Sequence, residues 1–169
     1  MIDFFDSKYL TEPAQTNRLF GVCDNGSLAY TITSGGPTKW IAVVTNDRQK
    51  TMQFVPIDHN IVVHNKKGEE ISQCDGMLYD KDYSWIAFVE LKEVRKLKKK
   101  KPYEQLESTV KLFLANHDYK LFGNRYAYVA NRKQRSPFAY SYKDEMQTFR
   151  SGSQAGDCLM KHTRVRHSA

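Results

Sequence analysis

Two carboxylates and an amine, those of Asp75, Glu90 and Lys92, have the types and spacing to serve chemistry at a single metal ion. Only Leu91 separates Glu90 from Lys92, and side chains alternate along a β-strand, so an extended segment would project both groups from one face. Carboxylate oxygens are the hard ligands that Mg²⁺ and Mn²⁺ prefer, and a nearby amine can stabilise charge on a phosphate.

The elements that must position these groups are two strands and a turn. Residues 85–92 are rich in β-branched and aromatic types, which predicts a mostly buried strand, and residues 70–79 are expected to form its partner. A four-residue loop over residues 81–84 would place Asp75 directly opposite Glu90 in this hairpin. Opposed side chains have Cβ atoms roughly 4.5 to 5.5 Å apart, so the two like charges would need a neutralising cation.

A simpler interpretation stays open at this point. Asp75 would be a surface acid near a turn, and Glu90 and Lys92 would form an exposed pair on an edge strand, because short motifs of this kind recur by chance. The compatible hairpin register and the helix that follows favour the metal site.

These residues resemble the PD-(D/E)xK nuclease superfamily over residues 11–149. The resemblance implies a restriction-endonuclease-like core, in which a helix precedes a three-stranded meander, a second helix and a further strand. It also implies that Asp75 and Glu90 are metal ligands, that the Leu91 carbonyl is a further ligand, and that Lys92 is the catalytic lysine. Cys74 stands where many members have proline, which makes the motif less specific.

The resemblance implies two further catalytic residues on helices. Glu12 lies in a predicted helix over residues 11–20, where it would be near the metal or would simply be an acid in a first turn. Gln105 lies in the helix expected after Pro102, beside an apolar stripe that includes Leu106 and Val110. It would reach the site or remain solvated.

A basic run over residues 94–101 joins the Glu90 strand to that helix, and we expect it to be a flexible loop. Its position near the proposed metal favours contact with a phosphate backbone, although such runs are usually solvated surface segments. The candidate nucleic-acid-binding residues are Arg95, Lys96, Lys98, Lys99, Lys100 and Lys101.

The whole chain is basic, with 26 Lys and Arg against 19 Asp and Glu and a formal charge of +7. A polyanionic partner is therefore expected, with DNA favoured over RNA. The 169 residues suit one domain over 1–169. Three widely spaced cysteines form no disulfide framework or zinc motif, and no segment predicts a signal peptide or a membrane span, so we expect a cytoplasmic protein.

The expected fold class is α/β, with a restriction-endonuclease-like core whose central mixed sheet is flanked by helices, plus extra N-terminal strands. Residues 40–45 and 51–55 are predicted to form a hairpin, and residues 60–63 a further strand. Residues 124–131 should follow the long helix as a parallel strand. Residues 160–169 are expected to be a flexible basic tail.

The function expected from these features is hydrolysis of a phosphodiester in DNA with Mg²⁺ or Mn²⁺. Overall similarity is to bacterial members of the superfamily, often found near mobile-element or defence genes. The competing hypothesis is a non-catalytic nucleic-acid-binding or interaction module on the same fold. A homodimer, or a subunit of a larger defence complex, is also compatible with the sequence.

Overall fold

The computed structural model describes residues 1–94 and 100–133, together with the backbone of residues 159–162 and 165–167. Two short 3₁₀ helices lie at Ser7–Tyr9 and Tyr119–Leu121. The remaining elements, in chain order, are β1 (Leu19–Asp24), β2 (Ala29–Ile32), β3 (Ala42–Asn46), β4 (Met52–Pro56), β5 (Gly76–Asp80), β6 (Trp85–Lys92), α1 (Lys101–Asn116), β7 (Asn124–Asn131), β8 (Leu159–His162) and β9 (Val165–His167).

A five-stranded mixed sheet in the order β4-β5-β6-β7-β8 forms the centre of the molecule. The pairs β4·β5 and β5·β6 are antiparallel, whereas β6·β7 and β7·β8 are parallel. A short turn suffices to reverse the chain between β5 and β6. The parallel pair needs a longer crossover, and α1 lies in the connection between β6 and β7.

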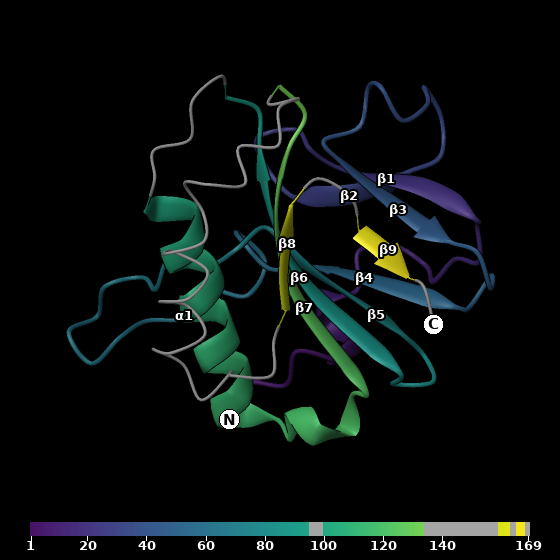
Figure 1. The fold of residues 1–169 in the computed structure, drawn as a ribbon. Helices are drawn as coiled ribbons and strands as arrows, with labels where there is room; N and C mark the ends of the chain where they lie inside the picture. Colours follow the sequence, from purple (N-terminus) through teal and green to yellow (C-terminus); the bar gives the residue numbers. More distant parts are fainter. Residues whose placement is uncertain (95–99, 134–158, 163–164, 168–169) are drawn as a thin grey trace.

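Helix α1 covers one face of this sheet, as Figure 1 shows. Its apolar side chains recur at helical spacing, with Leu106, Val110 and Phe113 all buried. They pack against alternate residues of β5 and β6 such as Met77 and Phe88. The α1 side of the sheet is therefore mainly an apolar core.

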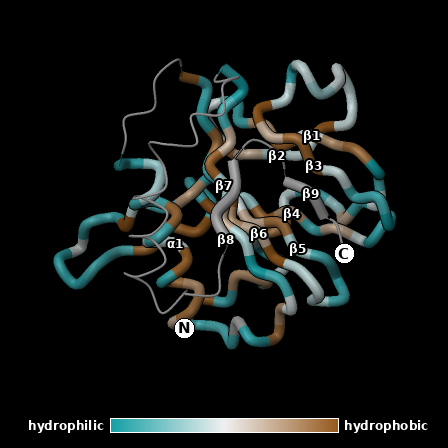
Figure 2. The backbone as a smooth tube through the Cα atoms, in the orientation of Figure 1, coloured by the Kyte–Doolittle hydropathy of each residue, from teal (hydrophilic) through white to brown (hydrophobic). Residues whose placement is uncertain are grey.

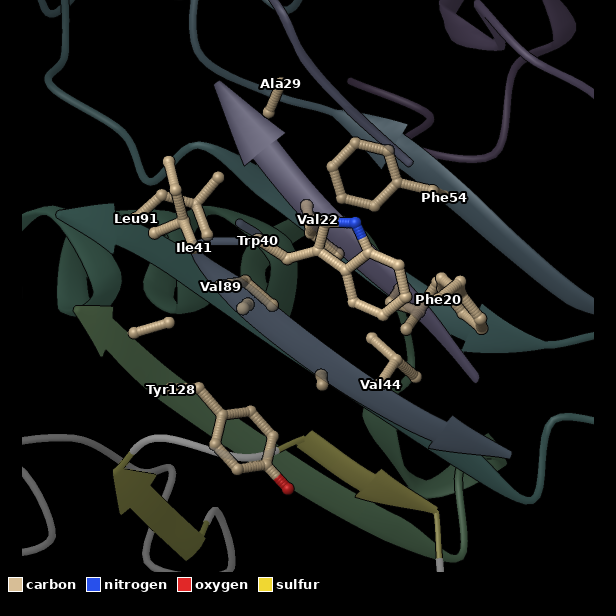
Figure 3. Packing of buried hydrophobic residues seen from close by; sticks show 14 of the residues in the cluster. Phe20, Val22, Ala29, Trp40, Ile41, Val44, Phe54, Val89, Leu91 and Tyr128 are labelled. Carbon is tan, nitrogen blue, oxygen red and sulfur yellow. The ribbon is translucent and has the colours of Figure 1, made fainter. Parts of the chain in front are cut away.

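A second sheet, in the order β2-β1-β3-β9, covers the opposite face. Figure 3 shows its apolar side chains facing those of the central sheet, and Figure 2 shows that hydrophobic residues concentrate along the packed strands. The packing is close at Gly21, where a Cβ atom would lie 2.2 Å from Cγ of Trp40. Residues at the interface include Phe20, Val22, Trp40, Val44, Phe54, Val89, Leu91 and Tyr128.

Several predicted elements are confirmed. The strand over Trp85–Lys92, the helix after the basic run and the parallel strand Asn124–Asn131 are present, and the α/β class with a mixed central sheet and extra N-terminal strands is correct. The expectation of a flexible tail over residues 160–169 is not confirmed, because strand β9 and most of strand β8 lie in it. Residues 95–99 of the basic run lie outside the described residues.

Other predictions are wrong. Residues 11–20 form no helix: Gln15 makes a β-bridge with Met52, and β1 begins at Leu19. The central sheet is consequently not flanked by helices on both faces, because its second face is covered by strands. Residues 60–63 lie in no strand, and the partner of β6 begins at Gly76 rather than at residue 70.

The predicted hairpin over residues 40–55 is also wrong. Its two strands exist as β3 and β4, but β3 pairs with β1 in the second sheet and β4 pairs with β5 in the central one. The two strands also differ in burial, because β3 alternates between buried and half-buried residues whereas β4 is buried throughout. None of the helices in the described ranges is both long and apolar enough to cross a membrane.

Candidate active site

The hairpin of β5 and β6 brings Asp75 and Glu90 together in the predicted register. Gly76 pairs with Val89 and Met77 with Phe88, so the next position sets Asp75 opposite Glu90. Glu90 alternates in phase with Ile86 and Phe88, which belong to the core under α1. The two carboxylates therefore lie on the α1 face at the end of the hairpin.

Both acids are buried, and the lysine is only partly so. Glu90 has no exposed surface and Asp75 is 9 % exposed, whereas the side chain of Lys92 is 27 % exposed. The Lys92 Nζ forms an ion pair with Oε1 of Glu90. Strand β6 lies between β5 and β7. The interpretation of Asp75 as a surface acid and of Glu90 and Lys92 as an edge-strand pair is therefore wrong.

The Asp75 carboxylate extends the hydrogen bonding of the hairpin beyond its last paired residues. Its Oδ2 accepts a hydrogen bond from the main-chain N–H of Leu91. The preceding N–H, that of Cys74, donates instead to Oγ1 of Thr109 in α1, at 2.8 Å. The chain thus separates from β6 at Asp75, and the aspartate side chain occupies the place where strand pairing ends.

One carboxylate oxygen at this site lacks a partner. Oε2 of Glu90 is buried and has no hydrogen-bond partner among the described residues. A buried charged oxygen without a partner is costly, so such a group either keeps a proton or binds a cation. Burial and the nearby Asp75 charge raise the pKa of Glu90 to about 8, against the lowering effect of Lys92.

Burial and neighbouring charges also shift the pKa values of Asp75 and Lys92. Burial raises the pKa of Asp75 to about 6, against the lowering effect of the Leu91 N–H and the Lys92 charge. Burial alone would lower the pKa of Lys92, but the Glu90 carboxylate outweighs it and the pKa is raised. With all three groups charged, two acids and one lysine leave an excess negative charge.

Two acids from neighbouring elements add to that excess. Asp24 ends β1 and Asp58 follows β4, and the charges of both raise the pKa of Asp75. The main chain brings Asp58 near, because the Ile57 N–H donates to the Asp75 carbonyl at 2.9 Å. The contribution of Asp24 had no signal in the sequence, because it depends on how the two sheets stack.

Leu91 and Gln105 lie next to the carboxylates. Leu91 is paired with Ala130 of β7 as well as bonded to Asp75 through its N–H, so its peptide group is held on both sides. Its carbonyl remains a predicted metal ligand. Gln105 donates from Nε2 to the Gln73 carbonyl at 3.0 Å, and its Oε1 is buried with no hydrogen-bond partner in the described part of the chain. It therefore contacts the segment that leads through Asp75 into β5.

Glu12 has a different place from the predicted one. Both of its carboxylate oxygens accept from the main-chain N–H of Thr31 in β2, at 3.0 and 3.2 Å, and its carbonyl accepts from Gln53. Within residues 1–94 and 100–133, no three His, Cys, Asp or Glu side chains are grouped closely enough to share a metal ion. Glu12 thus joins β2 to β4 and does not join Asp75 and Glu90.

The basic run is described only at its ends. Lys100 and Lys101 are exposed at the start of α1, while Arg95, Lys96, Lys98 and Lys99 lie outside the described residues. The start of α1 is near the site, since Gln105 in its second turn reaches Gln73. Lys100 and Lys101 therefore stay predicted phosphate contacts.

Besides Asp24, Thr109 is a residue at this site that the sequence did not reveal. It is completely buried and accepts from the amide that precedes Asp75. The only signal was its position four residues after Gln105, which puts both on one side of α1.

Comparisons of this chain with protein-family models, with curated proteins and with solved structures return no match. The case for the site therefore comes from the geometry of Asp75, Glu90 and Lys92.

Proposed function

We propose that the protein is a metal-dependent phosphodiesterase acting on nucleic acid, with Asp75, Glu90 and Lys92 as its catalytic residues. The observation that carries the proposal is the convergence of two buried carboxylates and one lysine at the end of one hairpin, with Oε2 of Glu90 lacking a partner among the described residues. Structural acids in a protein interior normally have their oxygens satisfied by hydrogen bonds.

The donor set fits a hard divalent cation such as Mg²⁺ or Mn²⁺. Asp75 and Glu90 would each supply an oxygen and the Leu91 carbonyl a third, which leaves coordination positions for water, as these ions prefer. The excess negative charge of the two acids over Lys92 favours such an ion. A cation held there would make a coordinated water more acidic and would offset negative charge on a phosphate.

The roles of the protein side chains follow from their positions. Asp75 is held by the Leu91 N–H and orients its second oxygen at the end of the hairpin. Glu90 lies opposite it, fully buried, so water does not screen its charge. Lys92 is the most exposed of the three and is the group that would meet a phosphate and support its developing charge.

The partner class rests on charge. The chain carries a formal +7, and exposed Lys100 and Lys101 begin the helix that reaches the site. Basic surface of this kind attracts a nucleic-acid backbone, and DNA is the favoured substrate.

The test uses purified protein with labelled single-stranded DNA, double-stranded DNA and RNA, in Mg²⁺, Mn²⁺ or EDTA. Wild type is compared with Glu90→Gln and Lys92→Met, and Asp80→Asn serves as a control because Asp80 is a buried acid at the other end of the same hairpin. We expect cleavage that needs the metal, a loss of at least about 100-fold in the two site variants, and retained cleavage in the control.

Other outcomes would contradict the proposal. Nucleic-acid binding that survives EDTA and both site substitutions, without products, would indicate a binding module instead. Cleavage that is equal in wild type and Glu90→Gln would show that the chemistry lies elsewhere.

A further inference from the structure

We propose that Thr109 is the positioning residue for Asp75. Its hydroxyl holds the segment before Asp75 against α1 and apart from β6, and so sets the direction of the aspartate carboxylate. The catalytic consequence of this inference rests on the proposed function. The positioning itself concerns hydrogen bonds that exist without any metal or substrate.

Helix α1 holds both polar groups of one peptide, the peptide that joins Gln73 to Cys74 just before Asp75. The Cys74 N–H donates to Oγ1 of Thr109 at 2.8 Å, and the Gln73 carbonyl accepts from Nε2 of Gln105 at 3.0 Å. These contacts join residues 32 and 35 positions apart in the sequence and lie in the interior. The segment before Asp75 therefore follows the helix and not the neighbouring strand.

This arrangement replaces strand pairing at the site. Continuing the register of Gly76 with Val89 by two positions would set Cys74 opposite Leu91. The Cys74 N–H is instead bonded to Thr109, and the Leu91 N–H is bonded to Oδ2 of Asp75. If α1 released Cys74, the segment before Asp75 would lose its anchor, and the Asp75 carboxylate would no longer be held against the Leu91 N–H.

The Thr109 hydroxyl is suited to this role because it both donates and accepts a hydrogen bond. A hydroxyl has one hydrogen to donate and lone pairs with which to accept. Thr109 donates its hydrogen to the Gln105 carbonyl at 2.9 Å, one turn earlier in α1, so it meets the Cys74 N–H as an acceptor. The residue is completely buried, and serine could reproduce both bonds whereas valine could not.

The experiment measures amide hydrogen exchange by NMR in EDTA for wild type, Thr109→Val, Thr109→Ala and Thr109→Ser. The readout is the exchange rate of the Cys74 and Leu91 amides relative to the Ala87 amide in the middle of β6. We expect both rates to rise about tenfold in the valine and alanine variants, the size of one lost hydrogen bond, and to stay near wild type in the serine variant. Thr109→Ala decides the question if the valine variant does not fold.

Val110→Ala is the matched control, since Val110 is buried on the same helix but belongs to its apolar face. It should raise the exchange of all core amides together, without the selective change at Leu91. Binding of Mn²⁺, measured by calorimetry, should weaken in Thr109→Val and Thr109→Ala and be unchanged in Thr109→Ser.

These measurements distinguish a failure of the positioning role of Thr109 from a failure of the proposed function. Unchanged relative exchange at Leu91 in both the valine and the alanine variants would overturn the role of Thr109. A wild-type protein that neither binds Mn²⁺ nor cleaves nucleic acid would overturn the proposed function, while the exchange rates would still decide whether Thr109 positions Asp75.

Discussion

Asp80 and Glu90 are both completely buried carboxylates on the β5–β6 hairpin, yet their surroundings are opposite. Asp80 accepts from the Ser84 N–H at 2.7 Å, the Trp85 N–H at 3.2 Å and Nζ of Lys50 at 3.1 Å. Glu90 has the Lys92 amine on one oxygen and no hydrogen-bond partner on the other among the described residues. Asp80 is thus a structural acid whose hydrogen bonds stabilise the turn, whereas Glu90 has an oxygen that can bind a cation or a proton.

The two acids should therefore affect stability with opposite dependence on pH. The pKa of Glu90 is raised to about 8, mainly by burial. A raised pKa means that the folded protein holds the proton more tightly than the unfolded chain, so stability is lost as pH rises from the unfolded value toward about 8.

The first prediction concerns Glu90→Gln, which removes this titration. In EDTA, the variant should unfold at a higher temperature than wild type at about pH 8.5 and at a similar temperature near about pH 4, where Glu90 is neutral in both states. Thermal unfolding followed by circular dichroism checks this. A variant that is less stable than wild type at the higher pH would contradict the predicted charge burial.

The second prediction is that the effect of Asp80→Asn on stability depends on pH in the opposite sense. Burial would raise the pKa of Asp80, but the bonds from Ser84 and Lys50 outweigh it and lower the pKa. The ionised Asp80 therefore adds to the free energy of unfolding above its pKa in the unfolded chain. This contribution is lost as the pH falls through its lowered pKa in the folded protein. The variant should lose about 1 to 3 kcal/mol near neutral pH and less in acid, as measured by urea unfolding.

The third prediction separates the structural role of Asp75 from its chemical one. Asp75→Asn keeps an oxygen that can accept from the Leu91 N–H, whereas Asp75→Ala leaves that buried donor without its acceptor at a cost of about 1 to 3 kcal/mol. Both variants should lose metal-dependent cleavage, but only the alanine variant should show a large loss of stability. Cleavage by a folded Asp75→Asn protein would contradict the ligand role.

The hairpin at the site could be predicted because local signals determine it. Residues 85–92 are apolar over a strand length and are preceded by a polar turn. A four-residue loop in that turn would place Asp75 opposite Glu90, and the pairing of Gly76 with Val89 confirms this register. The crossover to β7 followed from the helical spacing of Leu106, Val110 and Phe113.

Residues 11–20 could not be assigned correctly because their local signals conflict with their tertiary contacts. Thr11, Glu12 and Pro13 have the composition of a helix start, but Glu12 is bonded to Thr31 and Gln15 to Met52, and these partners lie far along the chain. For the same reason the sequence did not show that β3 and β4 belong to different sheets. Thr109 was missed because its partner, the Cys74 N–H, is a main-chain group that any residue provides.

The fourth prediction follows from the corrected place of Glu12. Glu12→Gln retains an oxygen that can accept from the Thr31 N–H, so it should keep wild-type Mn²⁺ affinity and cleavage. Glu12→Ala should lose about 1 kcal/mol of stability without a change in metal affinity. Calorimetric titration with Mn²⁺ checks both variants, and a weaker affinity in the glutamine variant would restore Glu12 as a ligand.

The fifth prediction concerns Gly76, the residue between Asp75 and the rest of β5. A Cβ atom there would lie 2.4 Å from Cζ of Phe54 and 3.2 Å from the Val55 carbonyl oxygen. Phe54 is packed between the two sheets and is 2 % exposed, so its ring has little room to move. We expect Gly76→Ala to destabilise the protein by about 1 to 3 kcal/mol through overpacking.

The same substitution should also disturb the site, because the start of β5 would shift away from β4 and carry Asp75 with it. Gly68→Ala is the control: its φ of +81° makes alanine unfavourable, but apart from its two chain neighbours no residue has an atom within 4 Å of the added Cβ. It should cost about 1 kcal/mol and leave Mn²⁺ affinity unchanged. If Gly76→Ala lowered stability and Mn²⁺ affinity no more than Gly68→Ala does, the close packing of β4 against β5 would not be what fixes Asp75 at the hairpin end.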